Sequence, residues 1–190
     1  MKILIIDYGM SNLRSVGNAL EYLGCQYMFS NRWQDIKNFD AYILPGVGAF
    51  GEAMKNLRKQ NIIVPLSEQV LLNKKPFLGI CLGMQLVAQF SEEGGHFKGL
   101  EWMESSVIKL KIIDDYRLPH VGWNSINIKE KVPMFSNLPE NPNFYFDHTY
   151  QFICNKKYVL AKCNYGTELI AAIRKENIFG TQFHPEKSQI

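Results

Sequence analysis

Short apolar runs alternate with helically spaced apolar residues along the first half of the chain. Residues 3–6 form a continuous, largely β-branched run that ends at Asp7, as expected of a strand buried on both faces. Apolar residues then recur at helical spacing at Leu13, Val16, Leu20 and Leu23. Ser11 or Asn12 can cap this predicted helix at its start, and Gly24 suits its end.

The same alternation continues to about residue 90. Strands are predicted at residues 27–29, 41–44 and 77–80, and the second of them is stopped by Pro45-Gly46. Helices are predicted at residues 50–59, 65–73 and 82–90. Strands that alternate with helices indicate an α/β fold with a doubly wound, mostly parallel sheet flanked by helices.

From about residue 100 the pattern changes to strands with few long helices between them. The predicted strands cover residues 107–110, 125–128, 143–148, 158–163, 169–174 and 178–183. Lys175-Glu176-Asn177 has the composition of a hairpin turn. These strands predict an added antiparallel β layer in the C-terminal half. No flexible linker separates the two halves, so we expect residues 1–190 to form one domain.

Charge and cysteine content exclude several classes of protein. The 21 Lys and Arg residues against 18 acidic residues leave a net charge of +3, which is too mild to indicate nucleic-acid binding. No apolar stretch suits a membrane span, and we expect no signal peptide. The four cysteines (Cys25, Cys81, Cys154 and Cys163) form no CxxC pair and no metal-ligand spacing. Free thiols in a reducing cytoplasm, with no metal or cofactor, are therefore expected.

Cys81 stands out from the other cysteines because of its surroundings. It follows a predicted strand, precedes a predicted helix and lies between Gly79 and Gly83, which is the cysteine counterpart of a nucleophile elbow. Small neighbours leave room for strained backbone angles, and the start of the helix favours the thiolate form of a cysteine. Taken alone, the motif also fits a buried structural cysteine between two packing glycines.

A base and its orienting carboxylate are predicted close to the C-terminus. His184 and Glu186 are two residues apart just after the last predicted strand, so on an extended chain their side chains point the same way. Pro185 keeps His184 out of helical conformation. Glu186 can then fix the tautomer of His184, whose other nitrogen faces Cys81. The His184–Glu186 pair indicates a catalytic site only in combination with Cys81.

Two turns can supply N–H groups to a developing negative charge. The glycines in residues 45–48 (PGVG) let backbone N–H groups turn toward such a charge, at the edge of the sheet where ligands bind. Leu82, immediately after Cys81, offers its own N–H. Alternatively, the turn at residues 45–48 only connects a strand to a helix and has no catalytic role.

With these segments in place, the sequence resembles the class I (triad) glutamine amidotransferases. Within that family it is similar to the glutaminase subunits of imidazole glycerol phosphate synthase. The segments that carry the resemblance span nearly the whole chain: residues 6–13 (IDYGMSNL), 45–50 (PGVGAF), 79–85 (GICLGMQ), 119–124 (PHVGWN), 148–150 (HTY) and 183–188 (FHPEKS). The third and last of these mark the whole class; the first and fourth favour this subfamily.

The resemblance implies a role for each matching residue. Cys81 would form a glutamyl thioester, His184 would transfer protons, and Glu186 would hold His184. The remaining implied residues fall into three groups: Val47 or Gly48 together with Leu82 as oxyanion donors; Gln85, Thr149 and Tyr150 as contacts to L-glutamine; and Asn12, Trp123 and Lys187 as contacts to the partner subunit. That partner would be a (β/α)8-barrel cyclase in a heterodimer, which receives the ammonia for histidine biosynthesis. Glutaminase activity is typically low without it.

Three positions depart from the family pattern. Ser11 and Thr149 stand where the family usually has Gly and Ser, and both changes are mild. The chain stops at Ile190, where the family normally continues into a final helix. A truncated chain and a shorter version of the protein both account for this, and stability or partner contact is expected to differ.

Three other functions remain open on the sequence alone. A paralogous glutaminase could supply ammonia to an amidotransferase that modifies a surface sugar. A catalytically silent regulatory subunit could use the same fold, although the complete triad argues against it. A cysteine protease on this fold would cleave peptides without releasing ammonia from glutamine.

Overall fold

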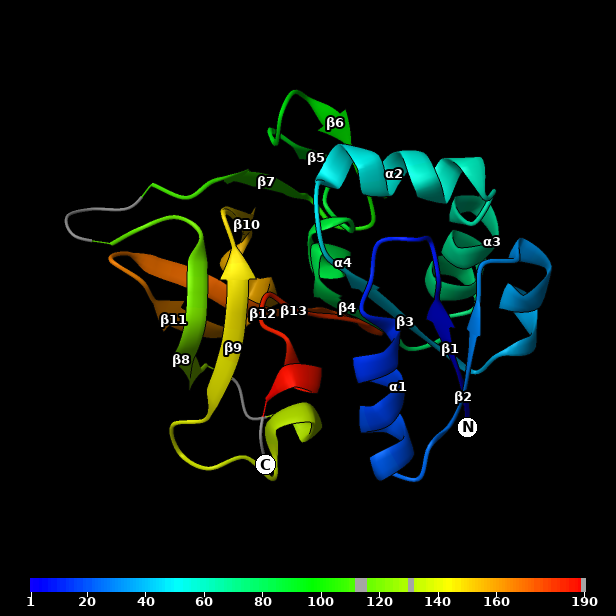
Figure 1. The fold of residues 1–190 in the computed structure, drawn as a ribbon, viewed down its shortest axis with the longest axis horizontal. Coiled ribbons are helices and arrows are strands. Elements are labelled where there is room, and N and C mark those ends of the chain that lie inside the picture. The colour runs from blue at the N-terminus through cyan, green and yellow to red at the C-terminus, as the bar shows by residue number, and fades with distance from the viewer. Residues whose placement is uncertain (112–115, 130–131, 189–190) are drawn as a thin grey trace.

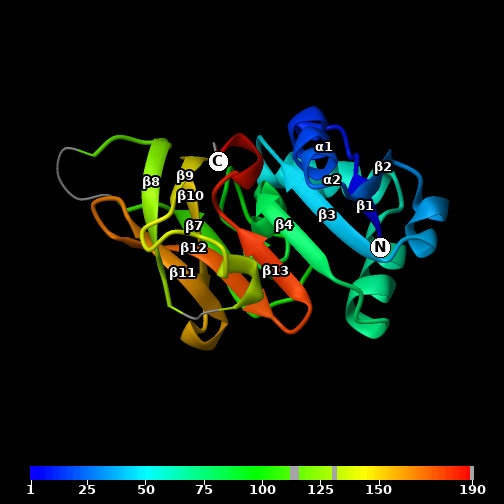
Figure 2. The same cartoon turned by 90° about the horizontal axis from the view of Figure 1, so that it is seen from below.

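The computed structural model describes residues 1–111, 116–129 and 132–188, and a nine-stranded sheet runs through its centre (Figure 1). One half of this sheet is parallel, in the order β2-β1-β3-β4-β13. Its strands are β1 (Lys2–Ile6), β2 (Gln26–Ser30), β3 (Ala41–Gly46), β4 (Phe77–Cys81) and β13 (Ile178–Thr181). Figure 2 shows the strands from β11 to β2 side by side in one twisted surface.

The other half of the sheet is antiparallel and continues from β13 in the order β12-β11-β8-β9. Its strands are β12 (Glu168–Lys175), β11 (Val159–Asn164), β8 (His120–Ile128) and β9 (Asn143–His148). A separate four-stranded sheet consists of β10 (Tyr150–Cys154), β7 (Ser105–Lys109), β5 (Phe90–Ser91) and β6 (Phe97–Lys98). The predicted fold class is therefore confirmed, with the antiparallel strands shared between an extension of the main sheet and a second sheet.

Helices cover both faces of the parallel half. They are α1 (Leu13–Tyr22), α2 (Phe50–Lys59), α3 (Ile63–Ser67) with its continuation as one π-helical turn (Glu68–Leu72), and α4 (Leu82–Gln85). Alternate residues of β1 face opposite sides: Ile3 and Ile5 pack with α1, whereas Leu4 and Ile6 join the core formed with α2, α3 and α4. This alternation is what a strand buried on both faces requires.

Short 3-10 turns complete the described chain at Trp33–Asn38, Pro133–Phe135, Lys156–Tyr158 and Pro185–Lys187. The predicted hairpin turn joins β12 to β13, where Glu176 takes a positive φ of 54°. No helix among residues 1–111, 116–129 and 132–188 has the length and apolar character of a membrane span.

The prediction for the segment after Cys81 was wrong, because α4 ends at Gln85 rather than near residue 90. The backbone beyond it pairs elsewhere: the N–H groups of Leu100 and Trp102 donate to the carbonyls of Leu86 and Val87, at 2.8 and 3.1 Å. These bonds take the carbonyls that a longer helix would have used. β3 also departs from expectation, since it runs through Pro45 and ends at Gly46.

Candidate active site

The backbone at Cys81 has the strained conformation of a nucleophile elbow. β4 ends at Cys81, whose φ is 52° and ψ is −109°, and α4 begins at the next residue. Such angles in a residue with a Cβ cost about 1–3 kcal/mol and persist only where the surroundings enforce them. The side chain is almost fully buried. The strain therefore lies at the residue predicted to be the nucleophile.

The glycines that flank Cys81 allow close packing rather than unusual backbone angles. A Cβ on Gly83 would lie 1.7 Å from the carbonyl oxygen of Leu44, and one on Gly79 would lie 2.6 Å from the carbonyl group of Gly83. Neither glycine is among those with positive φ in the described chain. The glycines thus leave room for the strained turn, as expected, because the first turn of α4 lies directly on β3 and β4.

His184 and Glu186 form the predicted pair. Nδ1 of His184 lies 2.8 Å from Oε1 of Glu186, and both side chains are almost completely buried. The backbone N–H of His184 donates to the carbonyl of Tyr145 at 2.8 Å. The local geometry differs from the extended chain that we expected, because Pro185–Lys187 forms a 3-10 turn. The two side chains meet across this turn.

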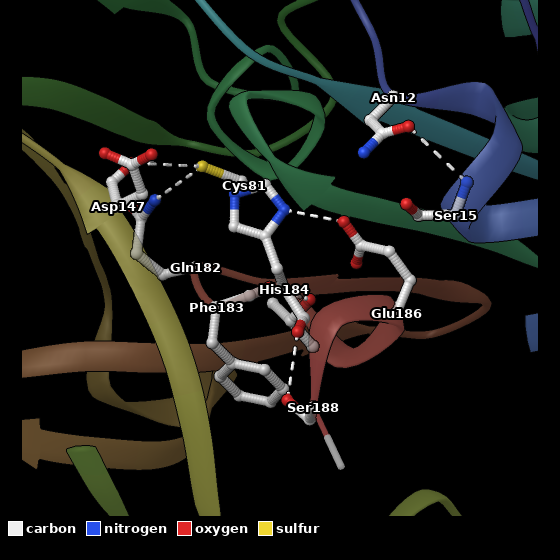
Figure 3. A network of polar contacts seen from close by, with 10 residues as sticks. Asn12, Ser15, Cys81, Asp147, Gln182, Phe183, His184, Glu186 and Ser188 are labelled. Carbon is white, nitrogen blue, oxygen red and sulfur yellow. Dashed lines mark hydrogen bonds and ion pairs between the residues drawn. The ribbon is translucent and has the colours of Figure 1, made fainter. Parts of the chain in front are cut away.

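The thiol of Cys81 and the ring of His184 lie next to each other in the site (Figure 3). Burial lowers the pKa of His184, but Cys81 and the carboxylate of Glu186 outweigh it and raise the pKa to about 9. Nε2 of His184 has no hydrogen-bond partner among the described residues. The thiol instead donates to the carbonyl of Asp147 at 3.7 Å.

Gln182 is a neighbour of Cys81 that the sequence analysis missed. Its Nε2 donates to the sulfur of Cys81 at 3.7 Å (Figure 3). Its Oε1 accepts from Nε2 of Gln85 at 3.0 Å. The period-two alternation of a strand could have indicated it, since Gln182 precedes His184 by two residues. Gln182 is buried and links a predicted substrate contact to the predicted nucleophile.

The predicted oxyanion turn is closed in this structure. The N–H of Val47 donates to the carbonyl of Met10 at 2.8 Å. Gly46 stands opposite Cys81 in the parallel ladder of β3 and β4. Because Pro45 has no N–H and the N–H of Val47 is engaged, the ladder pattern leaves the carbonyl of Gly46 facing the N–H of Leu82. Two of the predicted donors, Val47 and Leu82, therefore face protein carbonyls.

A pocket of about 410 Å³ opens beside Cys81, within the size range of small-molecule sites. All the predicted oxyanion and substrate residues line it: Val47, Gly48, Leu82, Gln85, Thr149 and Tyr150. A larger hollow of about 1010 Å³ lies among residues 127–128 and 132–141, and no residue of the predicted triad is among the described residues that line it. The smaller pocket is therefore the candidate active site.

Several backbone groups in the wall of this pocket already have partners. The carbonyl of Tyr150 lies 3.1 Å from Nε2 of Gln85 and 2.8 Å from Nδ1 of His148, and the carbonyl of Thr149 accepts from the N–H of Leu110 at 3.0 Å. The bond from Gln85 ties the turn between β9 and β10 to α4, and the bond from Leu110 ties it to the residue after β7. A ligand would accordingly meet a wall whose carbonyls are bonded within the protein.

The three residues predicted to contact a partner lie on elements that contact one another around Tyr145 and the turn at residues 185–187. Trp123 is half exposed, and its ring lies 6.0 Å from that of Tyr145. Nζ of Lys187 lies 4.9 Å above the same Tyr145 ring. Asn12 caps α1 by accepting from the N–H of Ser15 at 3.5 Å, and α1 contacts the turn at residues 185–187 (Figure 1).

Fold and site together define the class of this protein. The sequence pattern of the family described as glutamine amidotransferase class-I matches residues 4–189, and the chain belongs to that family. It is 47% identical over 190 residues to "Imidazole glycerol phosphate synthase subunit HisH 2" of Vibrio vulnificus (strain YJ016), covering 100% of this chain and 89% of that protein. It is 44% identical over 187 residues to subunit HisH 1 of Campylobacter jejuni (strain RM1221), covering 98% and 93%.

Solved structures of low sequence identity share the fold. A structure titled "Crystal structure of glutamine amidotransferase" superposes with a TM-score of 0.76 at 19% identity, covering 96% of this chain and 90% of that chain. The structure of PurLQS from Thermotoga maritima superposes with a TM-score of 0.73 at 18% identity, covering 98% and 88%. At such identities the similarity extends to the fold alone.

Proposed function

We propose that this chain is the glutaminase subunit of an imidazole glycerol phosphate synthase and acts, as one domain, in histidine biosynthesis. It would hydrolyse L-glutamine to L-glutamate and ammonia. The observation that carries the proposal is the strained Cys81, which lines a pocket of about 410 Å³ and lies beside the buried His184–Glu186 pair. Similarity to synthase subunits over the full chain supports the choice of pathway.

The chemistry follows from the three side chains. The sulfur of Cys81 attacks the amide carbon of glutamine as a thiolate, and its proton is held by His184, whose raised pKa of about 9 keeps the ring charged at neutral pH. His184 then returns a proton to the leaving nitrogen, which departs as ammonia and leaves a glutamyl thioester. A water molecule next attacks the thioester while His184 accepts its proton, and glutamate leaves as the thiol is re-formed. Glu186 holds the ring of His184 and stabilises its charged form.

Each attack creates an oxyanion, which needs N–H donors that are free to face it. Leu82, with Val47 or Gly48, is proposed to supply them. In the closed turn, Val47 is bonded to Met10 and Leu82 faces Gly46. Rotation of the peptide between Gly46 and Val47 would release both groups at once. A resting enzyme with a closed turn would be slow, and this favours activation by a partner.

That partner is proposed to be a (β/α)8-barrel cyclase, joined to this chain as a cytoplasmic heterodimer. Asn12, Trp123 and Lys187 are the proposed contacts. Trp123 supports this assignment because large half-exposed aromatic residues are enriched at protein interfaces. Docking beside the turn at residues 185–187 would bring the acceptor of ammonia close to Cys81.

Ammonia release from glutamine, measured with and without a cyclase subunit, tests the proposal. We expect activity that rises with the cyclase and is lost in Cys81→Ala, which should still assemble with it. A glutamine-like electrophile should label Cys81, as mass spectrometry can report. An unlabelled Cys81 in the complex would support the silent subunit. An active enzyme that fails to restore growth without histidine would instead support the sugar-modifying paralogue.

A further inference from the structure

The hydroxyl of Tyr8 is a buried donor that has no partner among the described residues. Tyr8 follows β1 at the edge of the sheet that carries the active site, and its side chain is completely buried. A Cβ placed on Gly46 would lie 2.1 Å from this hydroxyl oxygen and 3.0 Å from the Cβ of Leu82. The hydroxyl therefore lies against the oxyanion turn and close to the nucleophile elbow.

A hydroxyl in this position calls for an explanation, because a buried polar group without a hydrogen bond destabilises the fold. Tyr42 shows how the same chain treats a comparable group. Its buried hydroxyl donates to the carbonyl of Ile36 at 2.7 Å and lies 3.2 Å from the carbonyl of Phe39. Phenylalanine at position 8 would fill the same space without the unsatisfied group. The unsatisfied hydroxyl thus suggests a partner in another state of the enzyme.

The closed turn indicates which group that partner is. When the N–H of Val47 turns away from Met10 to face an oxyanion, the carbonyl of Gly46, in the same peptide unit, must turn toward the segment that carries Tyr8. A buried carbonyl needs a donor. The Tyr8 hydroxyl adjoins Gly46 and is uncommitted.

We propose that Tyr8 is a positioning residue whose hydroxyl donates to the carbonyl of Gly46 and thereby stabilises the open oxyanion turn. The inference rests on the proposed glutaminase function. Tyr8 does not touch glutamine, since it is completely buried and does not line the pocket. It acts on the equilibrium between the closed and open turns.

The protonation state of Tyr8 agrees with a donor role. Burial, and secondarily the charge of Cys81, raise its pKa far above the ordinary value of 10.0. The hydroxyl therefore keeps its proton when the sulfur of Cys81 becomes a thiolate.

Tyr8→Phe tests the inference, with Tyr42→Phe as the matched control. In the complex with a cyclase subunit, we expect Y8F to lower kcat for glutamine hydrolysis roughly 3- to 10-fold, the effect of one neutral hydrogen bond. KM should not change, and the melting temperature should be equal or higher. Y42F should lower the melting temperature and leave kcat unchanged.

Two results would overturn the role of Tyr8: a wild-type kcat in Y8F, or a loss of melting temperature as large as that of Y42F. The second would mean that the hydroxyl has a structural partner in the resting enzyme. Failure of the parent enzyme to release ammonia from glutamine would contradict the proposed function itself. If the parent enzyme releases no ammonia, the role of Tyr8 can still be tested with a glutamine-like electrophile. Equal rates of Cys81 labelling by this reagent in the parent and Y8F complexes would contradict that role.

Discussion

Nδ1 of His120 lies 3.0 Å from Nε2 of His148, and both rings are buried. The contacts at the two ends determine the tautomers: Nδ1 of His148 lies 2.8 Å from the carbonyl of Tyr150 and must donate. Its Nε2 then accepts from Nδ1 of His120, whose Nε2 accepts from the amide of Asn124 at 3.3 Å. The chain of donors runs in one direction toward Tyr150, in the wall of the candidate active site.

This pair predicts how stability depends on pH in acid. Burial lowers the pKa of both histidines from 6.5 to about 4, and a second imidazole adds to the effect, that of His148 for His120 and that of His184 for His148. Between those values the unfolded chain binds protons that the folded chain excludes, so the stabilising contribution, complete above about pH 6.5, is lost as pH falls toward 4. Melting temperatures measured from pH 7 to 4 should decline over this window.

The variant His148→Gln should melt lower at neutral pH and show a smaller decline in acid. His96→Gln is the matched control, because His96 is exposed, and its melting curve should follow that of the parent protein. Identical acid declines in H148Q and the parent would show that other groups, such as paired carboxylates, dominate the acid response.

Glu186→Gln should separate the orientation of His184 from its charge. The amide keeps the size of the side chain but removes one of the two groups that raise the pKa of His184. Glutaminase activity should fall about 10²-fold or more, the range for a disturbed general base. A raised histidine pKa stabilises the fold fully below about pH 6.5 and loses this contribution as pH rises through about 9.

The E186Q protein should consequently show a flatter loss of melting temperature between pH 6.5 and 9 than the parent. Glu52→Gln removes a carboxylate from an exposed pair with Lys55, and such pairs contribute little. It should therefore change neither the activity nor the alkaline slope. If the melting temperature of E186Q still fell as steeply as that of the parent between pH 6.5 and 9, the raised pKa of His184 would be due to Cys81 alone.

Gln182→Met tests the residue that the sequence analysis missed. The substitution keeps an unbranched buried side chain but removes the N–H that faces the sulfur of Cys81. A hydrogen bond to a charged acceptor contributes about 1.5–3 kcal/mol, so we expect a loss of kcat on the order of 10- to 100-fold. Gln89→Met, at an exposed site, is the control. Full activity in Q182M would make the contact incidental.

Lys187→Ala tests the proposed contact with the partner. Lys187 and Lys157 each place Nζ 4.9 Å from a tyrosine ring, of Tyr145 and Tyr158 respectively. Contacts of this kind that are at least partly exposed contribute on the order of 0.5–1 kcal/mol, so both alanine variants should lose similar, small amounts of folding stability. Only K187A should reduce the activation of glutaminase by the cyclase. Equal activation in the two variants would remove Lys187 from the interface.

Local pattern was sufficient for elements in which a continuous apolar run or a helical apolar repeat ends at polar residues or at glycine. The apolar run that became β1 and the repeat that became α1 were found within two residues of their observed bounds, and α2 was found at its observed bounds. The end of α4 was predicted wrongly because its residues and those just after it are nearly all buried. No polar face therefore marks where the helix stops. The strands of two residues, β5 and β6, are too short to show any period.

The sequence by itself determined the chemical groups: a cysteine at a strand-to-helix turn, and a histidine and glutamate two residues apart. It also determined the family, through motifs spread along the chain. Only the tertiary structure decided that Gln182 contacts Cys81, that Val47 is bonded to Met10, and that the hydroxyl of Tyr8 lies beside Gly46 with no hydrogen-bond partner among the described residues. The reason is physical: periodicity reports which face of an element is buried, whereas hydrogen-bond partners depend on which distant segments the sheet order brings together.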